Sequence, residues 1–207
     1  MGSVYLSTAY LGPVQQYCKL LQYPDVYFET AENYLKQTYR NRCVIAGANG
    51  PLSLSIPIEK PDSLKCLTRD IRISEHGNWH HLHWNAILSA YNTSPFFEYY
   101  QDDFIPFYEQ TFDFLFDFNE QLRQLICDLL DIHPTVHFTE TYQVDTAHDF
   151  RESIRPRNPL EDASFSPTPY YQVFREKHGF LPNLSIIDLL FNMGPEGILV
   201  LNNSIAG

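Results

Sequence analysis

Apolar and polar positions in the first 30 residues switch from an extended pattern to helical spacing and back. Val4 to Tyr10 is rich in β-forming residues, and Gly12-Pro13 opens a segment in which apolar residues recur at helical spacing as far as Leu21. Asp25 to Glu29 then forms a second extended run after Pro24. The opening predicts a β-α-β unit, which is typical of a doubly wound fold.

A β-hairpin is predicted next. Asn49-Gly50 is the strongest hairpin signal in the chain and joins Cys43-Val44-Ile45 to Leu52 through Ile58. Arg69 to Ser74 alternates apolar and polar residues, which predicts a further strand.

The middle of the chain has helical periodicity. Asn78 is placed to cap a helix that continues to Tyr91, and Asn119 to Asp131 is amphipathic. Between them Phe96 to Phe118 is rich in aromatic residues, and Pro106 fits the first turn of a helix that begins after Asp102-Asp103. These helices are expected to contribute apolar side chains to the hydrophobic core.

The last third mixes a strand, a loop and short helices. Val136 to Tyr142 alternates like a strand, whereas 145–169 holds four prolines and predicts a long loop, which acts as a lid, binds a ligand or is disordered. Tyr170 to His178 predicts a helix with Gly179 as its C-terminal cap.

A strongly apolar helix is predicted from Leu184 to Met193. Asn183 is its candidate N-cap and Gly194-Pro195 its stop, and Ile198 to Leu201 is expected to form a terminal strand. Together these elements predict an α/β chain with a Rossmann-like three-layer arrangement, a β-hairpin excursion and a helical middle; α+β is the alternative. Residues 1–207 are expected to form one domain.

The composition limits the kinds of partner that the protein is expected to bind. Fourteen Lys and Arg against 25 Asp and Glu give a formal charge of −11, which disfavours nucleic acid. The chain has no apolar run long enough for a membrane span and no secretory signal pattern, so a cytoplasmic protein is expected. The four cysteines match no zinc or redox spacing.

Basic residues are few, and Lys36, Arg40 and Arg42 fall within seven positions, with Tyr39 and Asn41 between them. Guanidinium groups bind phosphate or carboxylate bidentately, and Asn41 adds a hydrogen-bonding group, so this basic group predicts a site for a small anionic substrate. In an extended segment Lys36, Arg40 and Arg42 share one face. The alternative is that the arginines neutralise nearby carboxylates.

A second basic group, Arg151, Arg155 and Arg157, lies in the proline-containing loop. If that loop closes over the first basic group, a charged substrate would order both. A solvated, mobile loop is the alternative.

His76, His80, His81 and His83 crowd one region near two tryptophans. One helix supplies too few ligands in register for zinc, so no metal site is expected. His83 is the candidate general acid or base, because imidazole titrates near neutral pH. A histidine packed on tryptophan explains the pattern equally well.

Asp188 lies in an apolar helix and is expected to be buried with a partner, for which Arg40 or Arg42 would serve. Asn192 lies one turn further on the same face and could share this role. Asp188 is therefore a candidate catalytic residue that orients an arginine, and a structural ion pair is the alternative.

Several stretches resemble the WbqC-like family of bacterial proteins. They are Tyr10-Leu11-Gly12-Pro13 with Tyr17, the run from Tyr39 to Ile45, Gly50-Pro51 through Ile58, Trp79 to Trp84 with Ala90-Tyr91, and Leu184 to Asn192. The resemblance implies a link to O-antigen and other surface-polysaccharide synthesis.

The same resemblance implies a transferase of acyl or aminoacyl groups, with glycyl as one candidate, onto a nucleotide-linked or phosphorylated sugar. In that interpretation Lys36, Tyr39, Arg40, Asn41, Arg42 and Asn192 bind substrate, while His83 and Asp188 are catalytic. A non-catalytic module that binds an anionic ligand is the alternative. The sequence leaves cofactors and oligomeric state open.

Overall fold

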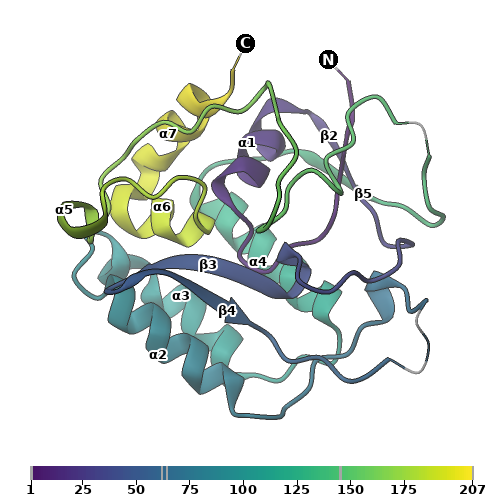
Figure 1. Cartoon of the computed structure of the whole chain (residues 1–207), viewed down its shortest axis with the longest axis horizontal. Coiled ribbons are helices and arrows are strands. Elements are labelled where there is room, and N and C mark those ends of the chain that lie inside the picture. The colour runs from purple at the N-terminus through teal and green to yellow at the C-terminus, as the bar shows by residue number, and fades with distance from the viewer. Residues whose placement is uncertain (1, 62, 64, 145, 207) are drawn as a thin grey trace.

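The computed structural model describes residues 2–61, 63, 65–144 and 146–206. A parallel sheet forms its upper part in Figure 1, with strands β1 (Val4–Leu6), β2 (Asp25–Phe28) and β5 (Thr135–Phe138) in the order β1-β2-β5. Helix α1 (Val14–Gln22) connects β1 to β2, so the predicted β-α-β opening is confirmed. The parallel sheet with its helices confirms the α/β class. The Rossmann-like three-layer arrangement stays a prediction.

The hairpin is a separate two-stranded sheet of β3 (Arg42–Gly47) and β4 (Gly50–Ser55). The chain reverses at 48–49, and Gly50 opens β4 with a φ of 109°, a conformation that glycine adopts without strain. The predicted hairpin is therefore confirmed, with its turn one residue earlier than Asn49-Gly50.

Three helices form the lower part: α2 (Trp79–Tyr91), α3 (Phe97–Glu109) and α4 (Leu115–Leu129). The predicted helix start after Asp102-Asp103 is wrong, since α3 begins earlier and carries Pro106 in its interior. Phe97, Phe104 and further aromatic residues bury one face of α3, which outweighs the hydrogen bond that Pro106 cannot donate.

Two smaller predictions in this region are also wrong. In place of a strand over Arg69 to Ser74 the chain forms a 3-10 helix, Thr68–Asp70, and then isolated bridges. Asn78 precedes α2 but has a φ of 48° and makes no side-chain capping bond.

The C-terminal part consists of α5 (Arg175–His178), α6 (Ile186–Met193) and α7 (Gly197–Ser204). The predicted terminal strand is wrong, because Gly197, Val200, Leu201 and Ser204 are buried at helical spacing. Ser185, not Asn183, precedes α6 as its N-cap residue. Asn183 instead accepts a hydrogen bond from Gln15 N at 2.9 Å and so caps the first turn of α1.

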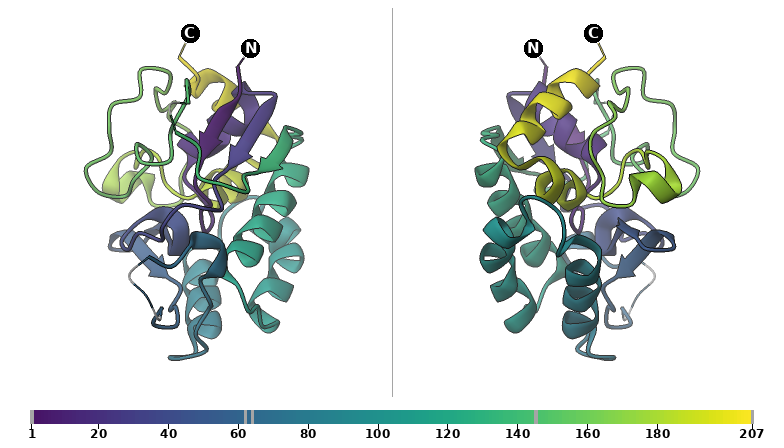
Figure 2. Two further views of the ribbon diagram at one scale, coloured as in Figure 1. Left: turned by 90° about the vertical axis from the view of Figure 1, so that its right-hand side faces the viewer. Right: turned by 90° about the vertical axis from the view of Figure 1, so that its left-hand side faces the viewer.

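The two ends of the chain pack together. Helices α6 and α7 lie beside α1 in Figures 1 and 2. Val14 N donates to Leu184 O at 3.0 Å, and Ser185 Oγ donates to Leu11 O at 2.7 Å. Within the described residues between β5 and α5 there is no helix or strand, and this long loop passes over the edge of the sheet through a parallel bridge between Tyr5 and Asp149. No helix of the described part is long and apolar enough for a membrane span.

Candidate functional site at the carboxyl edge of the parallel sheet

A polar residue follows each strand of the parallel sheet: Ser7 after β1, Glu29 after β2 and Thr139 after β5. Glu29 is fully buried, and its carboxylate accepts hydrogen bonds from Thr139 Oγ1 at 2.5 Å and from Arg151 Nη1 at 2.9 Å. In open α/β sheets ligands bind outside the carboxyl ends of the strands. This edge is therefore where a functional site is expected.

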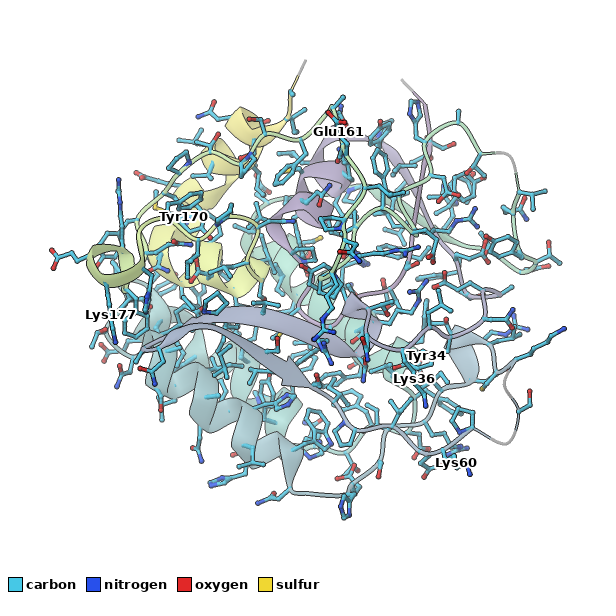
Figure 3. The ribbon with its side chains drawn as sticks, in the orientation of Figure 1. Tyr34, Lys36, Lys60, Glu161, Tyr170 and Lys177 are labelled. Carbon is cyan, nitrogen blue, oxygen red and sulfur yellow. The ribbon has the colours of Figure 1, made fainter. Side chains whose placement is uncertain are left out.

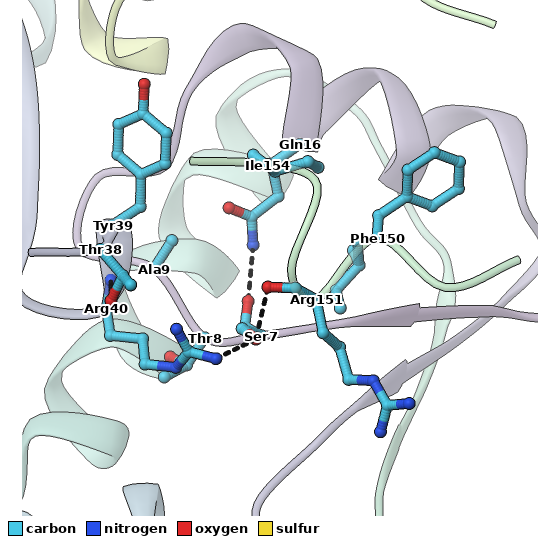
Figure 4. A pocket seen from close by; sticks show the side chains of 11 residues that line it. Ser7, Thr8, Ala9, Gln16, Thr38, Tyr39, Arg40, Phe150, Arg151 and Ile154 are labelled. Atoms are coloured by element: carbon cyan, nitrogen blue, oxygen red, sulfur yellow. Dashed lines mark hydrogen bonds between the residues drawn. The ribbon is translucent and has the colours of Figure 1, made fainter. Parts of the chain in front are cut away.

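A second buried ion pair lies beside Ser7. Arg40 is 2% exposed and donates from Nε to Glu32 Oε1 at 2.7 Å and from Nη2 to Glu32 Oε2 at 2.5 Å. The same Nη2 donates to Ser7 Oγ at 2.8 Å (Figure 4). Burial alone would lower the pKa of Arg40, but the hydrogen bonds and charge of Glu32 raise it above its usual value. Arg40 is thus permanently charged, and the carboxylate of Glu32 balances that charge.

The long loop adds its own charges at this edge. Arg151 is 4% exposed, donates to Glu29, and also binds Asp149 through Nη2 at 2.5 Å. Glu152 Oε1 lies 3.3 Å from Arg40 Nη2, and its other carboxylate oxygen pairs with Arg155. The loop therefore reaches one member of the first basic group, Arg40, and there a carboxylate of the chain takes the place of an anionic ligand. Closure of the loop over Lys36 and Arg42 stays a prediction.

Two cavities flank these ion pairs. The small pocket, shown in Figure 4, has a volume of about 10 Å³, room for one water molecule, and is lined by Ser7, Ala9, Arg40, Phe150 and Ile154 among others. The open hollow has a volume of about 450 Å³, within the range of small-molecule sites. Its lining residues are Ala31, Glu32, Asn33, Leu35, Tyr142 and Glu152. Glu32 lines the hollow while its partner Arg40 lines the small pocket, so their ion pair belongs to the wall between the two.

Comparison with known proteins identifies the family of this chain. The WbqC-like protein family matches residues 9–156, more than half of the sequence. The chain belongs to the WbqC-like family. A curated relative from Mycobacterium tuberculosis (strain ATCC 25618 / H37Rv), "Uncharacterized protein Rv1507c", is 24% identical over 210 residues that cover 89% of this chain and 90% of the relative. No solved structure matches.

The family match includes the predicted basic group, but the structure separates its members. The 3-10 helix Tyr39–Asn41 breaks the expected alternation, so Arg40 turns toward the sheet edge. Arg42 is half-buried in β3 and donates from Nε to Ser55 Oγ at 2.9 Å across the hairpin. The expectation that Lys36, Arg40 and Arg42 share one face of an extended segment is wrong for this reason.

The remaining members of that group differ in their surroundings. Tyr39 is buried and lines the small pocket. Asn41 Nδ2 donates to Ile56 O at 2.8 Å and braces the chain after the hairpin. Lys36 is exposed and follows Leu35 of the hollow (Figure 3).

Asp188 is fully buried, as expected, but the expected arginine partner is wrong. Its carboxylate accepts hydrogen bonds from Tyr91 Oη at 2.9 Å, Tyr170 Oη at 2.7 Å and Gln172 Nε2 at 2.8 Å. Burial raises the pKa of Asp188, although these three donors lower it in part. The reason for the error is that neutral phenol and amide donors satisfy the carboxylate. The predicted helix from Tyr170 to His178 forms only from Arg175. Tyr170 and Gln172 lie outside it and hydrogen-bond to Asp188 instead.

Asn192 lies one turn after Asp188 and donates from Nδ2 to the Asp188 main-chain oxygen at 2.7 Å. Figure 3 shows Tyr170 over the helix that carries both residues. Neither Asp188 nor Asn192 lines the small pocket or the hollow. Their role in substrate binding or catalysis stays a prediction.

His83 is 6% exposed and lies among aromatic rings. Its Nδ1 is 3.0 Å from Tyr10 Oη, which in turn is 2.9 Å from Tyr108 Oη. Burial lowers the pKa of His83 to about 4, so the imidazole is neutral near pH 7. His83 lines neither cavity, and its catalytic role also stays a prediction.

Sequence reasoning missed Ser7, Glu29, Glu32, Thr139 and Glu152. Three of them, Ser7, Glu29 and Thr139, come directly after strands in the structure, but the predicted extended runs include all three, so the pattern did not mark them as strand ends. Among the described residues, no group of three or more His, Cys, Asp or Glu side chains is arranged to hold a metal ion.

Proposed function

We propose that this WbqC-like protein transfers an acyl or aminoacyl group, for example glycyl, to a nucleotide-linked or phosphorylated sugar used in surface-polysaccharide biosynthesis in the cytoplasm. The observation that carries the proposal is the open hollow at the carboxyl edge of the sheet, whose volume of about 450 Å³ suits a sugar unit.

The lining of the hollow suits a polyhydroxylated ligand. The exposed carboxylate of Glu152 accepts hydrogen bonds from hydroxyl or amino groups, and the Asn33 amide both donates and accepts. The Tyr142 ring is half-exposed, with the Arg151 guanidinium 4.5 Å from its centroid. The exposed part of that ring offers an apolar surface to a sugar.

The chemistry needs a proton acceptor and a place for negative charge. Glu152 has a side chain that is 42% exposed and lies at the hollow, so it is the group that takes the proton from the attacking hydroxyl or amine as the acyl carbon–leaving-group bond breaks. Lys36 follows Leu35 at the rim, and its exposed ammonium supplies charge for a phosphate. In this proposal Arg40 positions Glu32 and does not bind the anion.

The alternative, a non-catalytic module for an anionic ligand, has less support. Such a module needs uncompensated positive charge, whereas Arg40, Arg151 and Arg155 each contact a carboxylate of the chain.

The test is a thermal-shift screen with nucleoside-diphosphate sugars and the corresponding free sugars, followed by mass spectrometry of incubations with activated acyl donors. A binding sugar nucleotide should raise the melting temperature of the wild type and of Tyr171→Ala, whose tyrosine is 49% exposed away from the hollow. Tyr142→Ala should lose that shift. Equal shifts in both variants would contradict the hollow as the site, and a shift without acylated product would favour the binding module.

A further inference from the structure

Ser7 is a polar residue at the carboxyl edge of the sheet that the proposed function has not yet used. It follows β1 directly, at the edge where ligands bind in α/β sheets. Ser7 lines the small pocket, and both Ser7 and Ala9 of that lining are partly exposed. Solvent therefore reaches the pocket beside this serine.

A carboxylate lies within hydrogen-bonding distance of the Ser7 hydroxyl. Ser7 Oγ donates to Glu32 Oε2 at 3.0 Å, and the main-chain oxygen of Arg151 is a more distant acceptor at 3.3 Å. Glu32 is itself oriented by the two hydrogen bonds from Arg40. A hydroxyl, an adjacent carboxylate and a third group that orients the carboxylate together form an activated nucleophile.

Arg40 contacts the hydroxyl as well as the carboxylate. Its Nη2 donates to Ser7 Oγ at 2.8 Å (Figure 4) and to Glu32 Oε2 at 2.5 Å. If the proton of Ser7 moves to Glu32, negative charge moves from the carboxylate to Oγ, and both positions lie against the same guanidinium. The buried charge of Arg40 therefore keeps a partner during the transfer, which avoids the cost of an unpaired buried charge.

The base that was assigned to the acceptor lies around the same nitrogen atom. Glu152 Oε1 is 3.3 Å from Arg40 Nη2, and Glu152 lines the hollow. Ser7 Oγ, Glu32 Oε2 and Glu152 Oε1 are thus all in contact with Arg40 Nη2. The serine hydroxyl therefore lies close to the group that activates an acceptor in the hollow.

We propose that Ser7 is a catalytic nucleophile that carries the acyl group from the donor to the acceptor, an inference that rests on the proposed function. In the first step Glu32 takes the proton of Ser7, Oγ forms a bond to the acyl carbon, and the bond from that carbon to the leaving group breaks. The leaving group departs with the electron pair of that bond and takes the proton from Glu32.

The second step transfers the acyl group to the sugar. Glu152 takes the proton of the acceptor hydroxyl or amine as the acceptor attacks the same carbon. Ser7 Oγ leaves with the electron pair of its ester bond and is protonated by water, to which Glu152 returns its proton.

The lining of the small pocket limits the chemical class of the acyl group. Leu6, Ala9, Phe150 and Ile154 are apolar, and the volume of about 10 Å³ is sufficient for a single water molecule. Beside Ser7 there is therefore space for an acyl group of about acetyl size, delivered by an activated ester or thioester.

Acetylation by p-nitrophenyl acetate tests the nucleophile, because this small ester supplies an acetyl group and a coloured leaving group. The wild type should release a burst of about one equivalent of p-nitrophenolate, and peptide mass mapping should find the acetyl group on Ser7. Ser7→Ala should reduce the burst about ten-fold or more. Absence of acetyl on Ser7 in the wild type would overturn the proposal, and that measurement needs no substitution.

Ser55→Ala is the matched control. The Ser55 hydroxyl is exposed and also contacts an arginine, Arg42 Nε at 2.9 Å, but it has no carboxylate partner within the described residues. Ser55→Ala should leave the burst unchanged, and Ser55 of the wild type should carry no acetyl group. A burst of equal size in Ser7→Ala and Ser55→Ala would overturn the proposal.

The outcomes separate this inference from the proposed function. Acetylation of Ser7 in a chain that acylates no sugar would contradict the proposed function alone. Formation of acylated sugar at the same rate by the wild type and by Ser7→Ala would overturn Ser7 as the nucleophile and leave direct transfer in the hollow.

Discussion

Arg40 donates two hydrogen bonds to Glu32 through Nε and Nη2, and the pair is almost completely shielded from solvent at the carboxyl edge of the sheet. The arginine that sequence reasoning assigned to substrate is thus committed to a carboxylate of its own chain. Four consequences of this and other buried contacts are measurable.

Replacing Arg40 should destabilise the fold. Arg40→Met leaves the Glu32 carboxylate buried without its partner, which should reduce the free energy of unfolding by about 3–5 kcal/mol. Arg42→Met, in the same basic group but half-exposed, should change it by about 0.5 kcal/mol or less. Urea unfolding of the two variants measures the difference, and similar midpoints would contradict the buried-pair interpretation.

Asp188 should make stability depend on pH in an unusual direction for a carboxyl group. Burial raises its pKa in the folded chain above the unfolded value, so its favourable contribution is present below the unfolded pKa and is lost as pH rises through the folded pKa. Asp188→Asn removes this titration.

The measurement for Asp188 is urea unfolding of the wild type and Asp188→Asn over a series of pH values. The free energy of unfolding of the wild type minus that of the variant should decrease as pH rises from the unfolded to the folded pKa of Asp188. A difference that stays constant with pH would show that the Asp188 pKa is not raised.

His83 should stay neutral well into the acid range. Its pKa is lowered to about 4 by burial, so its contribution to stability is complete above the unfolded value of about 6.5 and is lost as pH falls toward 4. Imidazole resonances followed by NMR should show His83 titrating near pH 4. A value near 6.5 would mean that the ring is solvated.

Gly194 should tolerate no side chain. It has a φ of 55°, and an added Cβ would lie 2.5 Å from Phe96 Cδ1. Gly50 has a φ of 109° with nothing within 4 Å of an added Cβ. Gly50→Ala should therefore cost about 1 kcal/mol from backbone strain alone, and Gly194→Ala clearly more. Melting temperatures of the two variants provide the comparison.

Local pattern predicted most of the elements, because strands, hairpin and long helices each carry their own periodicity. It failed where a long-range contact decides the local structure. Asn183 caps α1, far away in sequence, instead of the helix beside it, and Tyr170 binds Asp188 instead of starting a helix. Ile198 to Leu201 forms part of α7 instead of the predicted strand, since four consecutive apolar residues fit a strand or a helix equally well.

The candidate site was less predictable than the fold. The sequence analysis selected Arg40 and the proline-containing loop as candidates, but the partners of each charge depend on how segments separated by more than a hundred residues meet, as Arg40 and Glu152 do. Glu32 carried no local signal that distinguished it from a surface acid. The positions directly after the strands become a guide only once the strand ends are known, because the topology of a parallel sheet then brings them to one edge.

The packing of α1 against α6 and α7 limits how far this protein can be shortened from its C-terminal end. The family match ends at residue 156, yet the backbone of Val14 is bonded to Leu184, and Cys18 Sγ donates to Leu201 O. A polypeptide that stopped at the limit of the match would leave the buried side of α1, including Leu20, facing water. The packing of the family-matched region, residues 9–156, is therefore completed by residues that follow position 156.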